Sequence, residues 1–257
     1  MLQISPIPAF QDNYLWLIEN GEETWIVDPG DATPVLKVLE SRKLKLTGIL
    51  ITHHHPDHIG GVAGLLHSEL QIIGPQKNQF ELVNRPVSED DTVQICGVEF
   101  NVMEVPGHTL NHLAYYAEPD NQAPVLFCGD TLFAAGCGRL FEGTPAQMYQ
   151  SLGRLQQLPE NTRIYCAHEY TEANLAFAHS VEPGNREIMT RMEEVADLRA
   201  KGKPSIPTNM QQENAVNPFL RTDSAEIVSS VMKYRSFDAV PEQVDVFSQL
   251  RKMKDIF

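Results

Sequence analysis

Four of the nine histidines of the chain lie in the stretch Thr52-His53-His54-His55-Pro56-Asp57-His58-Ile59-Gly60-Gly61. It continues an apolar run, residues 48–52, that is typical of a buried strand. His53 and His55 are two residues apart, so on an extended segment their rings point the same way, whereas His54 points away. Asp57 and His58 follow on the turn at Pro56. Imidazole and carboxylate groups suit zinc, iron or manganese, so this stretch predicts a metal site at the end of a strand.

The alternative interpretation is an exposed polar loop with a chance run of histidines. The preceding strand and the aspartate within the run argue against it.

Three further segments each place one residue of a ligand type just past an apolar run. His108 follows residues 98–105, Asp130 follows 125–128, and His168 follows 163–166. Loops at strand ends are where rigid elements aim side chains. A lone histidine after a strand is more often a turn or core residue, so each signal is weak by itself. Together they predict the remainder of a two-metal site.

Two other polar residues near these segments have a structural interpretation beside a functional one. His112 lies four residues after His108, and packing or support of a ligand is expected rather than ligation. Asp28 stands in Asp28-Pro29-Gly30, which is first of all a turn, although its carboxylate could support a ligand.

Composition excludes several classes of protein. The 257 residues carry 20 Lys and Arg against 34 Asp and Glu, a net charge of −14. This charge argues against binding to nucleic acid or to an anionic membrane, which needs basic patches. No apolar run approaches the roughly 18 residues of a membrane span, and no secretory signal is evident, so we expect a cytoplasmic protein. The four cysteines form no CxxC pair and are expected to be reduced, buried thiols.

The pattern of the chain changes near residue 171. Before it, strands alternate with turns and two helices, at residues 34–42 and 145–157. Strands are expected at 14–18, 24–27, 48–52, 70–73, 98–105, 112–117, 125–128 and 163–166. After it the pattern is helical, with a long loop at 203–218 and helices near 224–235 and 241–254. The sequence therefore predicts a mixed β/α domain followed by a helical one.

The chain resembles the metallo-β-lactamase superfamily and, within it, the glyoxalase II (hydroxyacylglutathione hydrolase) family. The His-rich stretch alone indicates only the superfamily, and the C-terminal helical part with its basic end narrows the resemblance to the family. The other segments that carry it are Asp12-Asn13-Tyr14, VDPGD at 27–31, PGHT at 106–109, GDTLF at 129–133, GCGR at 136–139, HEYT at 168–171, NPFLR at 217–221 and RKMKD at 251–255.

The resemblance implies an α/β fold, a metallo-β-lactamase-type four-layer αββα sandwich with a C-terminal all-helical domain. Residues 1–170 would form the dinuclear metal hydrolase domain, and residues 171–257 the glutathione-binding domain. One metal would be held by His53, His55 and His108, the other by Asp57, His58 and His168, and Asp130 would bridge both.

The resemblance also implies five substrate contacts, and these map to Arg139, Phe141, Tyr170, Arg251 and Lys254. Phe141 departs from the family pattern because it has no hydroxyl to donate, while Arg139 keeps a cation. Without the resemblance, Arg251 and Lys254 could be only a solvated basic helix end.

The implied reaction is hydrolysis of an S-(2-hydroxyacyl)glutathione, most notably S-lactoylglutathione from methylglyoxal degradation, to glutathione and a 2-hydroxy carboxylate. Two divalent cations would generate the hydroxide, with Asp57 or Asp130 orienting it. Zinc is the expected metal, with iron or manganese as alternatives. The expected partner is this small thioester alone, without nucleic acid or membrane, and the chain is expected to be a monomer.

Two other activities occur on the same fold. An iron-dependent persulfide dioxygenase uses one metal, which the full set of seven ligands argues against. A metal-dependent phosphodiesterase needs an electropositive face, which the net charge argues against. A non-catalytic metal-binding module would be expected to lack a ligand, and none of the seven is missing.

Overall fold

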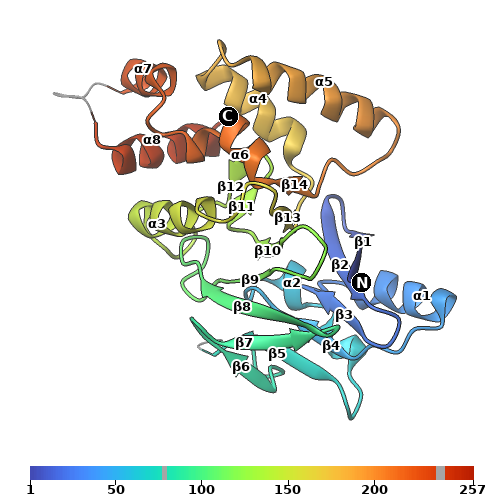
Figure 1. Ribbon diagram of the computed structural model, residues 1–257. Coiled ribbons are helices and arrows are strands. Elements are labelled where there is room, and N and C mark those ends of the chain that lie inside the picture. Colours follow the sequence, from blue (N-terminus) through green and yellow to red (C-terminus); the bar gives the residue numbers. More distant parts are fainter. Residues whose placement is uncertain (77–79, 236–240) are drawn as a thin grey trace. The chain divides into compact units, whose positions relative to one another are not determined.

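The computed structural model describes residues 1–76, 80–235 and 241–257, and the chain folds as two compact units (Figure 1). The first unit comprises Met1–Val105, Asn111–Gly129 and Arg163–Glu169. The second comprises Pro106–Leu110, Asp130–Thr162 and Tyr170–Phe257. The helical C-terminal part thus packs in one unit with two earlier segments of the chain. Whether residues 1–170 and 171–257 act as separate functional domains stays a prediction.

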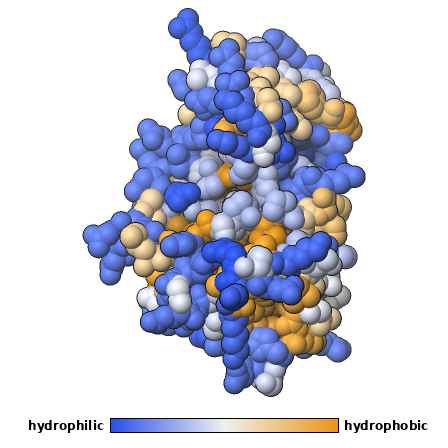
Figure 2. Space-filling view, turned by 90° about the vertical axis from the view of Figure 1, so that its right-hand side faces the viewer, coloured by the Kyte–Doolittle hydropathy of each residue, from blue (hydrophilic) through white to orange (hydrophobic). Residues whose placement is uncertain are grey.

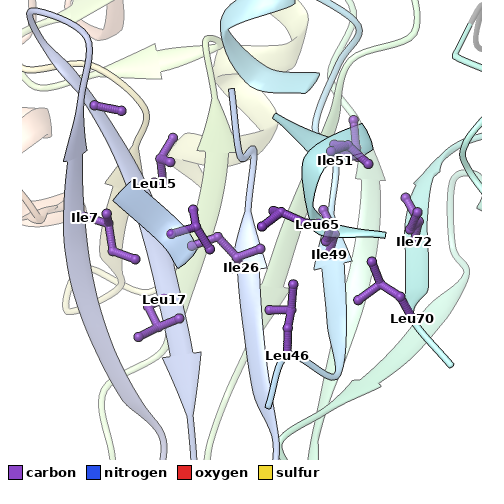
Figure 3. Packing of buried hydrophobic residues seen from close by; sticks show 13 residues of the cluster. Ile7, Leu15, Leu17, Ile26, Leu46, Ile49, Ile51, Leu65, Leu70 and Ile72 are labelled. Atoms are coloured by element: carbon purple, nitrogen blue, oxygen red, sulfur yellow. The ribbon is translucent and has the colours of Figure 1, made fainter. Parts of the chain in front are cut away.

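The first sheet of the first unit runs in the order β1-β2-β3-β4-β5-β6. Its first three strands pair antiparallel and the last three connections are parallel. The strands are β1 (Gln3–Ala9), β2 (Asn13–Glu19), β3 (Thr24–Val27), β4 (Gly48–Leu50), β5 (Gln71–Pro75) and β6 (Arg85–Val87). Helix α1 (Ala32–Arg42) begins at Asp31, whose side chain accepts a hydrogen bond from Thr33 N. Figure 3 shows the aliphatic layer of this sheet, which includes Ile7, Leu15, Ile26, Ile49 and Ile72, and Val35 of α1 belongs to the same cluster.

The second sheet of this unit has the order β13-β10-β9-β8-β7. Its strands are β7 (Thr92–Ile95), β8 (Val98–Glu104), β9 (Leu113–Ala117), β10 (Val125–Gly129) and β13 (Arg163–Cys166). Side chains connect the two sheets: Trp16 Nε1 of β2 donates to the Cys166 carbonyl of β13 at 2.9 Å, and the Tyr115 hydroxyl of β9 donates to the Ile51 carbonyl at 2.7 Å. The sheets therefore pack on each other through a buried core, which explains why every residue of β2 and β9 is buried.

Strands β1, β6 and β7 were not predicted, and the physical reason is their position. Each lies at the edge of its sheet. β1 contains Pro6 and Pro8, and β6 contains Pro86, and an edge strand tolerates proline because its outer N–H groups need no partner. The strands that were predicted for this unit, and its helix α1, are all present with small shifts of their ends.

The second unit is mainly helical. A hairpin of β11 (Leu132–Phe133) and β12 (Gly136–Cys137) precedes its first helix. Helix α3 (Pro145–Gln156) is capped by Thr144, which forms a reciprocal capping box with Gln147. The elements after the hairpin are α3 (Pro145–Gln156), α4 (Thr171–Val181), α5 (Arg186–Ala200), the short β14 (Thr208–Asn209), α6 (Met210–Val216), the 3₁₀ helix η2 (Pro218–Leu220), α7 (Ala225–Tyr234) and α8 (Gln243–Asp255).

Hydrophilic side chains predominate on the face of the molecule in Figure 2, with smaller hydrophobic areas between them. None of the helices in the described residues is both long and apolar enough to cross a bilayer. Each of the four cysteines is a buried thiol, as the sequence predicted.

Candidate metal centre and substrate cavity

Asp57, His58 and His168 form a group in the first unit whose ligand atoms lie within 4.8 Å of one another. Asp57 Oδ2 is 3.4 Å from His58 Nε2 and 3.3 Å from His168 Nε2. Asp57 and His58 lie on α2 (Pro56–Ile59), directly after the His-rich strand end, and His168 follows β13. Residues more than 100 positions apart in the sequence thus come together as one potential metal site.

Each imidazole of this group is oriented by a carboxylate on its other nitrogen. His58 Nδ1 lies 3.0 Å from Asp28 Oδ2, and His168 Nδ1 lies 2.9 Å from Asp12 Oδ1. A carboxylate at Nδ1 fixes the tautomer in which Nε2 carries the lone pair, the form that binds a metal. This arrangement is the one expected of metal-binding histidines.

Asp57 is held as a carboxylate anion. Burial raises the pKa of this group, but hydrogen bonds with His168, His58 and Asn13 outweigh burial and hold the pKa well below its ordinary value. Asn13 Nδ2 donates to Asp57 Oδ2 at 3.1 Å. Gly30 makes room for this turn, because a Cβ there would lie 1.8 Å from the Asp57 carbonyl oxygen.

His53 and His55 lie in the same unit with their ring nitrogens close together. His53 Nε2 is 3.1 Å from His55 Nδ1, and His53 Nδ1 is 3.0 Å from the Thr52 hydroxyl. Asp28 accepts hydrogen bonds from both the N–H and the hydroxyl of Thr52, each at 2.7 Å. One aspartate therefore fixes the strand end that carries His53 and also orients His58.

The two other histidines near this strand end behave as their spacing predicted. His54 is in none of the potential metal groups of the described residues. His112 is fully buried and stacks on the His53 ring at 4.5 Å, so it packs behind the candidate ligands.

The remaining predicted ligands, His108 and Asp130, belong to the second unit and lie close together there. His108 Nε2 is 3.4 Å from Asp130 Oδ2, and both residues are buried. His108 Nδ1 is hydrogen-bonded to the Arg139 carbonyl oxygen at 2.8 Å. Its Nε2 is therefore presented in the same way as that of His58. Because five predicted ligands lie in one unit and two in the other, their union in a single dinuclear centre stays a prediction.

A cavity of about 460 Å³ in the second unit contains His108 and Asp130 in its wall. All five residues predicted to contact the substrate line the same cavity, namely Arg139, Phe141, Tyr170, Arg251 and Lys254. Phe133, Cys137, Ala173 and Asn174 complete its lining. The volume is within the range of small-molecule sites.

Arg251 is not part of a solvated helix end. Its side chain is buried, and Nη1 donates to the Cys137 carbonyl oxygen at 2.7 Å. Lys254 is partly buried and donates to the Ala173 carbonyl oxygen at 2.9 Å. Burial and the neighbouring charge of Arg251 lower the pKa of Lys254 to about 8. The simple interpretation of these residues as surface cations is therefore wrong for Arg251 and incomplete for Lys254.

Arg139 and Phe141 lie at more exposed positions of the cavity. Arg139 Nε is 3.3 Å from Asp255 Oδ1, and that carboxylate is also 3.2 Å from Arg251 Nη2. The Phe141 ring is 62% exposed and meets the His108 ring edge-on at 5.3 Å. Phe141 thus offers an apolar face beside a candidate ligand.

The donor sets fit divalent metal ions. Every group contains only imidazole nitrogens and carboxylate oxygens, which suit zinc, iron and manganese. The histidine and aspartate clusters and the fold are consistent with a dinuclear metal site, as the sequence predicted.

Two family models match the chain. The model described as "Metallo-beta-lactamase superfamily" matches residues 10–69, and "Hydroxyacylglutathione hydrolase C-terminus" matches residues 169–257. Proteins named hydroxyacylglutathione hydrolase match over the full length. Those from Methylobacillus flagellatus and Photobacterium profundum are 49% and 50% identical over 260 residues, with 100% of both chains covered.

The chain belongs to the hydroxyacylglutathione hydrolase family. The recognition made from the sequence is thereby confirmed, and the persulfide dioxygenase and phosphodiesterase alternatives are not favoured.

Solved structures agree with the predicted fold class of this family member. The B3 metallo-beta-lactamase BLEG-1 has a TM-score of 0.63 at 23% identity, covering 86% of this chain and 100% of its own. ETHE1 from Myxococcus xanthus has a TM-score of 0.64 at 22% identity over nearly the whole of both chains. A protein solved in a di-iron-bound form has a TM-score of 0.59 at 26% identity, covering 85% of this chain and 100% of its own.

Two residues that orient candidate ligands, Asp12 and Asn13, have no individual role in the sequence-based prediction and appear there only as part of a motif. The ligand-supporting role expected for Asp28 is confirmed by its contact with His58 Nδ1. No signal in a single sequence links Asp12 to His168, 156 residues away.

Proposed function

We propose that this chain hydrolyses an S-(2-hydroxyacyl)glutathione, with S-lactoylglutathione as the principal substrate, to glutathione and a 2-hydroxy carboxylate. The observation that carries the proposal is the cavity in the second unit. It brings five predicted glutathione contacts together with two predicted metal ligands, His108 and Asp130. Family membership supports the same reaction, a step in methylglyoxal degradation.

The cofactors of this proposal are two divalent metal ions, with zinc as the expected metal and iron or manganese as alternatives. His53, His55 and His108 would hold one, Asp57, His58 and His168 the other, and Asp130 would bridge them. When bound, such ions activate water at neutral pH and polarise a carbonyl group.

Asp57 and Asp130 have the catalytic roles among the protein's own groups. Asp57 remains ionised because its pKa is held low, so it can accept a hydrogen bond from the attacking water and orient it. Asp130 stands at the wall of the cavity, beside His108. Asp12 and Asp28 keep the imidazoles in the tautomer that the reaction needs.

No cysteine of the cavity competes as a nucleophile. Burial raises the pKa of Cys137 to about 11, although Arg251 acts in the opposite direction. The thiol therefore stays protonated at neutral pH, and a protonated thiol is a poor nucleophile.

The cations of the cavity serve an anionic substrate. Glutathione carries two carboxylates and one ammonium, and the protein has a net charge of −14. Local cations must therefore overcome the repulsion between the two. Arg139 and Lys254 can approach the substrate, while Arg251 adds its charge from a buried position.

The remaining parts of this proposal concern the protein in the cell and the roles of its domains. We place it in the cytoplasm, as a monomer, and without nucleic-acid or membrane partners. Residues 1–170 would supply the hydrolase domain and residues 171–257 the glutathione-binding domain.

A substrate panel tests the proposed function. The purified protein is assayed on S-lactoylglutathione, on an acyl thioester that lacks the glutathione group, and on a phosphodiester. The proposal expects efficient hydrolysis of the first, a much higher KM for the second and no turnover of the third. Equal kcat/KM for the first two would refute glutathione recognition.

A further inference from the structure

The β11–β12 hairpin of the second unit connects two residues of the cavity wall, Asp130 and Arg139. Asp130 stands two residues before β11, and Arg139 two residues after β12. The two arms are held together where they meet, because Gly138 N donates to the Thr131 carbonyl oxygen at 3.1 Å. A Cβ at Gly138 would lie 1.9 Å from the Asp130 carbonyl oxygen, so the arms approach as closely as only glycine allows. The place of the hairpin therefore determines the place of Asp130.

The same hairpin also determines the orientation of His108. The Arg139 carbonyl oxygen accepts the hydrogen bond of His108 Nδ1. A shift of the hairpin would move this acceptor together with Asp130. Both candidate ligands of the second unit thus depend on one short element of two-residue strands, which is too small to be rigid by itself.

Polar side chains from the C-terminal helices hold this hairpin at its backbone. Asn174 of α4 donates to the Ala134 carbonyl oxygen at 3.0 Å, and Arg251 of α8 to that of Cys137. Asn217, at the end of α6, donates to the carbonyl oxygens of Phe133 and Gly136 at 3.2 and 2.9 Å.

Glu213 of α6 is the centre of this set. It is 1% exposed, and its Oε2 accepts hydrogen bonds from Ala135 N at 2.8 Å and from Asn217 Nδ2 at 2.9 Å. Its Oε1 accepts from the Thr208 hydroxyl at 2.8 Å. Ala135 has a φ of 53°, a left-handed conformation that alanine rarely adopts. The carboxylate therefore binds the hairpin at its most strained residue.

Glu213 has no place in the reaction itself. It does not line the cavity and is not in any potential metal group of the described residues. Burial raises its pKa above the ordinary value. Burying a carboxyl group is costly unless hydrogen bonds compensate, so its presence calls for a role that an apolar residue would not fill.

We infer that Glu213 is a positioning residue of the active site, which holds the 132–137 hairpin so that Asp130 and the Arg139 carbonyl keep their places beside His108. The inference rests on the proposed function only in so far as His108 and Asp130 are metal ligands. It assigns the C-terminal helices a second task besides binding glutathione, because they also build part of the metal site.

Three variants test this inference by metal content and by separate kcat and KM values. Glu213→Ala removes the hydrogen bonds to the hairpin. Glu213→Gln keeps them, since its amide oxygen can accept from Ala135 N and Asn217 while its amide nitrogen donates to the Thr208 hydroxyl. Glu182→Ala is the matched control: Glu182 is also buried in the second unit, but it binds Arg221, Asn185 and Ser224 instead of the hairpin.

The expected results separate positioning from stability. Glu213→Ala should lose about 10- to 100-fold in metal affinity or kcat, the range for residues that orient ligands, with a smaller change in KM. Glu213→Gln should restore both within a few-fold. Glu182→Ala should lower the melting temperature but keep metal content and kcat.

Two results would overturn the inference. One is wild-type metal content and kcat in Glu213→Ala. The other is an equal loss of metal and kcat in Glu182→Ala and Glu213→Ala, which would make both losses a consequence of stability. Should Glu213→Ala fail to fold, Glu213→Asp, whose carboxylate is one methylene shorter, replaces it with the same expectations. If the wild type does not hydrolyse S-lactoylglutathione, the proposed function fails, but the metal contents of these variants still decide the role of Glu213.

Discussion

The two units place their candidate ligands by different means. In the first, His58 lies on α2, shortly after the sheet strand β4, His168 follows the sheet strand β13, and a carboxylate orients each ring. In the second, His108 and Asp130 depend on a short hairpin that side chains from the helices hold by its backbone. The first arrangement is rigid because of the sheets, and the second because of a buried polar network. Candidate ligands with similar geometry are therefore held by sheets in one unit and by side-chain hydrogen bonds in the other.

Substitution of a ligand in the first unit should give the largest effect. His58→Ala removes a metal-binding imidazole, so kcat/KM should fall by more than the roughly 10- to 100-fold expected for an orienting residue. Metal content should fall in the same sample. The control is His54→Ala, within the same run of histidines, which should keep both. A large loss in His54→Ala would contradict the assignment of ligands within this stretch.

Loss of an orienting carboxylate should have the next largest effect. Asp12→Ala frees His168 Nδ1, so metal affinity or kcat should decrease by about 10- to 100-fold. Elemental analysis and steady-state kinetics measure both quantities. Asp31→Ala removes only the cap of α1 and should cost about 1 kcal/mol of stability without a change in kcat. Equal kinetics for the two variants would mean that the carboxylate at His168 is dispensable.

Lys254→Ala should act on substrate binding alone. A charge-assisted hydrogen bond contributes about 1.5–3 kcal/mol, so KM for S-lactoylglutathione should rise by about 10- to 100-fold while metal content stays unchanged. Lys252→Ala, on the same helix but exposed, should leave KM as it is. An unchanged KM in Lys254→Ala would remove this residue from the substrate site.

The pH dependence of KM tests the same residue in the wild type. The pKa of Lys254 is about 8, below the ordinary value, so its ammonium form is lost as the pH rises through 8. KM should therefore increase between pH 7 and pH 9. In Lys254→Arg the guanidinium remains charged, and this increase should be absent. The same rise of KM in both proteins would assign it to another group.

Phe141→Tyr should give the smallest effect. The new hydroxyl can donate a hydrogen bond to the glutathione moiety, and a neutral hydrogen bond contributes about 0.5–1.5 kcal/mol net. KM should decrease by roughly 2- to 10-fold with kcat unchanged. A KM that does not decrease would show that the departure at this position has no effect on glutathione binding.

Much of the fold could be predicted because its central strands have continuous apolar runs with ligand-type residues directly after them. The edge strands β1 and β6 could not, since Pro6, Pro8 and Pro86 disguise them, and β7 is an edge strand of only four residues. The ligands were recognisable from their local spacing and the family resemblance. Their orienting partners were not, because pairs such as Asp12 and His168 form only when distant segments meet. The burial of Arg251 escaped prediction for a similar reason: a basic residue near a chain end gives no sign that it will bind the Cys137 carbonyl.

A dinuclear site bridged by Asp130 is tested by titrating the metal-depleted protein with zinc and measuring hydrolysis of S-lactoylglutathione at each ratio. Activity should rise until two equivalents of zinc are bound per chain. Asp130→Ala should neither bind the second equivalent nor recover the activity. Full activity of the wild type at one equivalent, or two tightly bound equivalents with full activity in Asp130→Ala, would refute this site.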